Sequence, residues 1–174
     1  WTASHDIGQM GLKYQTKIDI IEMLKHKYRI FISSEAPLPK SLSKYQLQLL
    51  PEELHSALAF ASMYIGEGST TASECSILGV PNIYVNSLTV GYCTEQEKKY
   101  KLCYHLKQDE RICYVIGELI KKNNLLELWT ERKEKMLSEK IDVTALMVWF
   151  IEKYPHSFYQ MSEQVRSQTG LVQG

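Results

Sequence analysis

The chain has 174 residues, of which 44% are apolar and 23% are charged, so it is long enough to bury one hydrophobic core. Its 20 basic and 20 acidic residues cancel. This balance excludes the strong positive field that proteins use to hold duplex DNA or RNA, and we expect no nucleic-acid partner.

The first third of the chain predicts two helices and one strand. Apolar residues recur at helical spacing at Ile18, Ile21 and Leu24, which indicates an amphipathic helix. The apolar run at residues 28–32 then predicts a buried strand. Because proline favours the first turn of a helix, we expect a second helix to begin at Pro51 and to end near residue 61.

The rest of the chain alternates strands with helices. Short β-type runs predict strands at residues 63–65, 82–86 and 102–106. A helix at residues 70–78 lies between the first two of these strands, and Gly79 and Pro81 end it. Amphipathic patterns predict three further helices, at residues 112–120, 125–136 and 143–154.

This alternation predicts βαβ units, a mostly parallel sheet and helices on both of its faces. The fold class is therefore α/β, a three-layer α/β/α Rossmann-like domain with C-terminal helices, over residues 1–160. Residues 161–174 form a polar tail that we expect to fray. Ligands of such sheets bind where the strands end at their carboxyl edge, so we expect the site among residues 33–38, 66–71 and 86–95.

Residues 66–81, GEGSTTASECSILGVP, predict a strand end, a tight turn and a helix start in immediate succession. A helix start carries unpaired backbone N–H groups and the positive end of the helix dipole, which attract anions. A diphosphate site formed by Gly68, Ser69, Thr70 and Thr71 follows from this reading. The alternative is that the hydroxyl groups only cap the helix, as they do at most helix starts.

Two residues near this helix start are candidates for further contacts. Glu74 lies about one turn into the helix, where it can bind a ribose diol or merely interact with the helix dipole. His5 lies in a glycine-containing loop at the start of the chain, where it can donate to a phosphate or be an ordinary surface histidine.

Base or sugar contacts are predicted at four other positions. Glu35 follows the expected strand at residues 28–32, and Tyr92 and Glu95 follow the strand at residues 82–86. His55, on the helix that begins at Pro51, is a candidate for the same role, although a histidine on a helix is more often exposed than a ligand.

The cysteines and the apolar runs bear on location. Four cysteines lie ten or more residues apart, without the close pairs of a zinc site or a redox dithiol, so we expect reduced thiols in a cytoplasmic protein and no metal site. No apolar run approaches the roughly 20 residues of a spanning helix, so we expect no transmembrane segment. Peripheral attachment to the inner membrane face and homo-oligomer formation stay open.

Read together, the loops resemble a known family. The spacing of Gly66, Gly68, Glu74, Gly79 and Pro81 is similar to the nucleotide-diphosphate motif in the C-terminal half of GT-B-type glycosyltransferases and of UDP-N-acetylglucosamine 2-epimerase. The opening WTASHDIGQMGL and the segment ISSEAPLP also resemble an uncharacterised prokaryotic family of GT-B-like proteins.

The resemblance implies a UDP-linked nucleotide sugar as the substrate, with no other cofactor. Gly68, Ser69 and Thr70 then fall on the diphosphate loop, Glu74 on the ribose position and His5 near the phosphates. It also implies a missing N-terminal half of the same protein, which supplies the acceptor site, so the chain is the donor half of a glycosyltransferase or epimerase and is inactive alone. A regulatory phosphate-binding module and an interaction domain remain the alternatives, and no catalytic residue is assigned.

Overall fold

The structure of the chain is a computed structural model that describes residues 11–34 and 37–168. The chain divides into two compact units, Trp1–Met136 and Leu137–Gly174. The first unit holds the strands β1 (Tyr64–Gly66), β2 (Asn82–Val85) and β3 (Cys103–Leu106). Its helices are α1 (Tyr14–Leu24), η1 (Ser43–Tyr45), η2 (Pro51–Glu53), α2 (Leu54–Ala59), α3 (Ser69–Leu78), α4 (Gly91–Lys98), α5 (Ile112–Ile120) and α6 (Leu125–Ser138), and the last two residues of α6 belong to the second unit.

The three strands form one parallel sheet in the order β1-β2-β3. The register pairs Ile65 with Ile83, and Ile83 with Tyr104. Helix α3 connects β1 to β2, and α4 connects β2 to β3, as parallel strands require a crossover. The predicted α/β class is confirmed, and the strand order does not reverse among the described strands.

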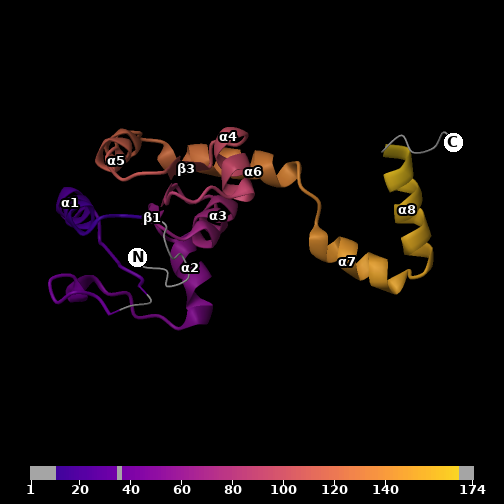
Figure 1. The fold of residues 1–174 in the computed structure, drawn as a ribbon, viewed down its shortest axis with the longest axis horizontal. Coiled ribbons are helices and arrows are strands. Elements are labelled where there is room, and N and C mark those ends of the chain that lie inside the picture. Colours follow the sequence, from indigo (N-terminus) through magenta and orange to yellow (C-terminus); the bar gives the residue numbers. More distant parts are fainter. Residues whose placement is uncertain (1–10, 35–36, 169–174) are drawn as a thin grey trace. The chain divides into compact units, whose positions relative to one another are not determined.

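Helices pack on both faces of this sheet. Successive side chains of β2 point to opposite faces, so each face contributes to a different core. Ile83 and Val85 point into one core, which also contains side chains of α1, α5 and α6. Tyr84 points the other way and packs on Ala72 of α3 and Cys93 of α4. Figure 1 shows α1 beside α5, which agrees with their contacts. The expected three-layer α/β/α arrangement is therefore present.

Helix α3 ends where the sequence predicts. Gly79 adopts φ 78°, the left-handed conformation that favours glycine, and its N–H donates to Ser76 O at 3.2 Å. The N–H of Val80 closes the turn on Cys75 O at 2.8 Å. The chain then passes directly into the buried strand β2, so the turn sets the distance between helix and strand.

The predicted strand at residues 28–32 is wrong. Only Ile32 pairs, in a single parallel bridge to Gln46. Ile32 packs with Ile21 of α1 and Leu42 in a separate small core, while Phe31 is 53% exposed. Residues 28–32 are buried on one side only, against this small core, so their burial does not require pairing with the main sheet.

The loop expected at residues 86–95 is wrong in its second half, because helix α4 begins at Gly91. Cys93, Gln96 and Tyr100 are buried and lie three and four residues apart, which is the helical period. An apolar pattern does not predict this helix, because the segment has few apolar residues and one of the buried positions is Gln96.

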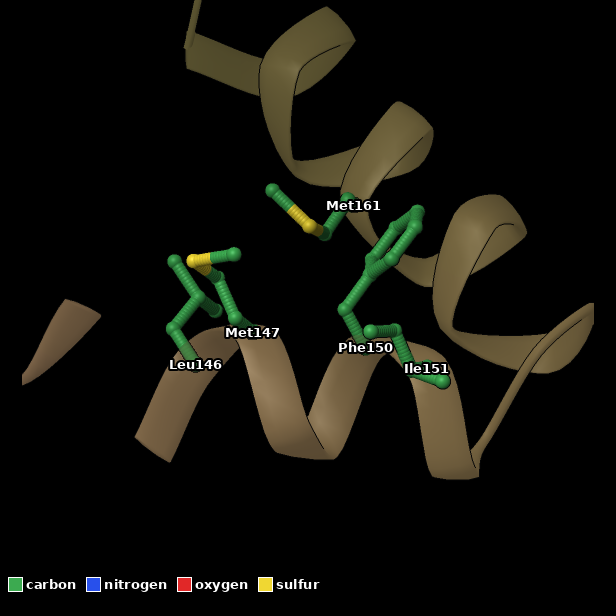
Figure 2. Close-up of a pocket in the computed structure, with 5 residues that line it drawn as sticks. All are labelled: Leu146, Met147, Phe150, Ile151 and Met161. Carbon is green, nitrogen blue, oxygen red and sulfur yellow. The ribbon is translucent and has the colours of Figure 1, made fainter. Parts of the chain in front are cut away.

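The second unit contains α7 (Val143–Glu152) and α8 (His156–Gln168). Asp142 caps α7 by accepting a hydrogen bond from Ala145 N at 2.9 Å. An apolar groove lies between the two helices, and Figure 2 shows Met161 of α8 facing the side chains of α7 across it. The start of the predicted polar tail, residues 161–168, belongs to α8, and the rest lies outside the described residues.

None of the helices in the described part of the chain is both long enough and apolar enough to cross a membrane.

Candidate functional site

The amino end of α3 lies at the carboxyl edge of the sheet, because β1 ends at Gly66 and α3 begins at Ser69. The N-cap residue is Gly68, at φ −82° and ψ 115°, and no side chain caps the helix. The sequence-based expectation that Ser69, Thr70 or Thr71 is the cap is wrong, since all three lie inside the first turn. Their backbone N–H groups donate to no residue that the structure describes.

The side chain of Tyr64, in β1, contacts this turn. Its hydroxyl lies 3.5 Å from Gly68 O, to which it donates, and it also bonds the side chain of Thr71. Burial raises the pKa of the Tyr64 phenol, so the group is neutral at physiological pH and acts as a donor. A Cβ atom on Gly66 would lie 2.2 Å from the phenol oxygen, so the absence of a side chain at Gly66 makes room for Tyr64.

Two predicted site residues from distant segments, Ser69 and Tyr92, are hydrogen-bonded to each other. The Tyr92 hydroxyl, in the first turn of α4, donates to Ser69 Oγ at 3.0 Å. Cys93 donates to Ser69 O at 3.5 Å, which fixes the backbone of the same residue. Because Ser69 Oγ accepts from Tyr92, the Ser69 hydroxyl keeps its own proton to donate.

A second pair of predicted residues also meets. His55 Nε2 of α2 lies 3.2 Å from Glu74 Oε1 of α3. The Glu74 side chain is 31% exposed, and it lies four residues after Thr70, so the two share one face of α3. Glu95 lies in the second turn of α4 and is exposed. The remaining candidates, His5 and Glu35, lie outside the described residues.

Sequence analysis missed Asn86, which joins all three strand ends. Asn86 Nδ2 donates to Glu67 O at 3.2 Å, and Asn86 Oδ1 accepts from Leu88 N at 2.9 Å. His105 Nε2 lies 2.8 Å from Asn86 O, and the His105 ring stacks on Tyr84. An asparagine directly after a buried strand was the available signal, because such a position faces the carboxyl edge.

The start of α1 is fixed to the same edge by two carboxylates. Glu67 accepts from Leu12 N at 2.7 Å and pairs with Lys17 Nζ at 3.2 Å, and the side chains of Glu67 and Lys17 are each 12% exposed. Asp109, which follows β3, accepts from Lys13 N at 2.9 Å and from the Thr16 hydroxyl. Glu67 therefore turns toward α1, where Lys17 pairs with its charge.

Asp109 predicts an acid-dependent loss of stability. Desolvation is the largest single influence and raises its pKa, but the hydrogen bonds of Thr16 and Lys13, with the Lys13 charge, together hold the pKa below its ordinary value. A carboxyl group whose pKa is lower in the folded state stabilises the fold fully above its unfolded-state pKa of about 3.9. This stabilisation is lost as pH falls through the folded-state pKa. Urea unfolding should show that Asp109→Asn has a lower free energy of unfolding than wild type at pH 7, and that this difference is smaller at pH 3. An equal difference at both pH values would contradict a depressed pKa for Asp109.

Among residues 11–34 and 37–168, no group of three or more His, Cys, Asp or Glu side chains has the arrangement of a metal site. Comparisons with protein families, with curated proteins and with solved structures find no match to this chain.

Proposed function

We propose that the first unit binds a nucleotide-diphosphate sugar, with the diphosphate at the amino end of α3. The observation that carries the proposal is the row of three backbone N–H groups at Ser69, Thr70 and Thr71, which have no partner among the described residues and lie at the carboxyl edge of a parallel sheet. This is the edge at which α/β domains bind their ligands.

The chemistry of the first turn of α3 suits an anion. The helix dipole places partial positive charge there, and the N–H groups donate in parallel. The Ser69 hydroxyl, held by Tyr92, and the exposed Thr70 hydroxyl add two donors. In a glycosyl transfer these groups would stabilise the negative charge that develops on the leaving diphosphate.

Glu74 suits a ribose diol. Its Oε1 is held by His55, which orients the carboxylate, and its second oxygen can accept from a sugar hydroxyl. Thr70 and Glu74 lie one turn apart on the same helix face, so one ligand can contact both as its diphosphate passes into its ribose. In this proposal Tyr92, which is bonded to Ser69, and Glu95 of α4 contact the donor sugar.

The proposed reaction class is transfer or epimerisation of a UDP-linked sugar in the cytoplasm. In this proposal the chain supplies the donor half, and an N-terminal half of the same protein supplies the acceptor site.

Titration calorimetry of the whole chain with UDP, UMP and inorganic phosphate tests the proposal. We expect UDP to bind at least tenfold more tightly than UMP or phosphate, because only UDP offers both a diphosphate and a ribose. Glu74→Ala and Thr70→Val should each weaken UDP binding by about tenfold, the value of one lost hydrogen bond to a charged group. The matched controls are Glu134→Ala and Thr130→Val, on α6.

Two outcomes would overturn the proposal. Equal affinity for phosphate and UDP would make the unit a general phosphate-binding module. Heat changes indistinguishable from buffer for all three compounds would leave α3 as a helix that binds no ligand at its amino end.

A further inference from the structure

Positive charge is concentrated in one stretch of an otherwise neutral chain. Residues 24–45 hold five of the 20 basic residues but only one of the 20 acidic residues, Glu35. All five are exposed. They are Lys25, Lys27, Arg29, Lys40 and Lys44. The remainder of the chain therefore carries a net negative charge, which makes this stretch the basic pole of the molecule.

The bridge at Ile32 brings two parts of this stretch together. Ile32 N donates to Tyr45 O at 2.7 Å, and Leu47 N donates to Ile32 O at 2.8 Å. Ile30 and Ile32 pack on the small core under α1, whereas Arg29 and Phe31 are not part of that core. Both are exposed, and Phe31 is 53% exposed.

The residues at and just after the end of α1 add Lys25 and Lys27 to the basic residues of this stretch. Glu22 is hydrogen-bonded to Lys25, which lowers the pKa of the carboxyl, and against the opposing effect of desolvation the charges of Lys25, His26 and Lys44 lower it further. Lys44 of η1 therefore lies within electrostatic reach of the end of α1. We call Lys25, Lys27, Arg29, Phe31 and Lys44 the basic–aromatic surface.

Each aromatic ring in this region lies under a cation. Arg29 Cζ lies 4.9 Å from the centroid of the Phe31 ring, Lys44 Nζ lies 4.9 Å from that of Tyr45, and Lys27 Nζ lies 5.5 Å from that of Tyr28. Each of these rings therefore has a basic side chain over one of its faces. Basic residues combined with Phe, Trp or Leu are typical of segments that lie on a membrane surface.

We propose that the basic–aromatic surface binds the surface of a lipid bilayer that contains anionic lipids. The Lys and Arg side chains meet the lipid phosphates, and Phe31 enters the boundary between headgroups and acyl chains. The occupant follows from charge complementarity together with the exposed Phe31, because an anionic bilayer surface offers phosphates to the basic side chains and an apolar boundary to the ring. Binding of this kind requires no spanning helix and is independent of the nucleotide site on α3.

Co-sedimentation of the whole chain with vesicles tests the proposal. We expect it to sediment with vesicles of phosphatidylcholine mixed with phosphatidylglycerol, and not with phosphatidylcholine alone. Binding should fall as salt is raised, because surface charges are screened. The double variant Arg29→Glu with Lys44→Glu should bind at least about tenfold more weakly, since each basic residue near an anionic surface contributes a several-fold factor.

Matched controls separate the surface from net charge and from apolarity. Lys98→Glu with Lys122→Glu changes the net charge equally, at exposed positions on α4 and after α5, and should leave binding unchanged. Phe31→Ser should weaken binding, whereas Phe60→Ser, at a residue that is 92% exposed, should not. Circular dichroism melting of every variant shows whether the fold is kept.

The proposal is overturned if the chain stays in the supernatant with both kinds of vesicle, or if it binds both equally. It is also overturned if the two double variants bind anionic vesicles alike. Loss of vesicle binding on addition of a single-stranded oligonucleotide, with direct binding of that oligonucleotide to the same residues, would assign the surface to nucleic acid instead.

Discussion

Thr70→Asp is expected to abolish UDP binding while the thermal stability of the chain stays unchanged or rises slightly. A carboxylate in the first turn of α3 repels a diphosphate, and we expect a loss of at least about 100-fold, or about 2.7 kcal/mol. The same carboxylate interacts favourably with the helix dipole, by about 0.3–1 kcal/mol. Calorimetry with UDP and thermal melting of the same sample measure the two effects separately.

The matched control is Thr70→Asn, which has the same shape without the charge. It should weaken UDP binding far less than Thr70→Asp does. Equal losses in the two variants would show that the charge at this position is irrelevant, and that the helix start does not hold the diphosphate.

Gly66→Ala is expected to lower the free energy of unfolding by about 2–3 kcal/mol, as overpacking in a tightly filled region does. The new Cβ would lie 2.2 Å from the Tyr64 hydroxyl oxygen and 2.5 Å from Cζ of its ring. Tyr64 packs against two buried clusters, so its ring has little room to move. For a chain of this size the change corresponds to a fall in melting temperature of about 5–10 °C.

Gly68→Ala is the matched control in the same loop. A Cβ there would lie 3.6 Å from its nearest neighbours, an ordinary contact, and φ −82° suits any residue. We expect a cost of about 1 kcal/mol or less, because alanine is a poorer N-cap than glycine. If the two variants melt at the same temperature, the contact between Gly66 and Tyr64 is not what limits the loop.

Much of the fold was predictable because its signals are local. The strands β1, β2 and β3 are short apolar runs, and Gly79 and Pro81 mark the end of α3 in the sequence itself. Two segments were not predictable in this way. Residues 28–32 have the composition of a strand, yet they pack on a separate small core and make only one bridge. Helix α4 has few apolar residues, and its period shows only when the burial of Gln96 is known.

The candidate site divides in the same way. The run of glycine and hydroxyl residues before α3 predicts an anion site from sequence, since a helix start attracts anions whatever surrounds it. The bond from Tyr92 to Ser69 and the pair of His55 with Glu74 join residues of different helices. Neither can be predicted from spacing, because each depends on how α3 packs against its neighbours.

By itself, the sequence determined the strands β1, β2 and β3, the parallel α/β class and the place where α3 ends. Periodicity and glycine or proline punctuation are properties of a few consecutive residues, so they survive without tertiary contacts. Only the tertiary structure decided that Gly68 rather than a hydroxyl residue is the N-cap, that Glu67 turns toward Lys17, and that Asn86 joins the strand ends. These outcomes depend on which partner each polar group finds when distant segments pack, and a linear pattern holds no record of that choice.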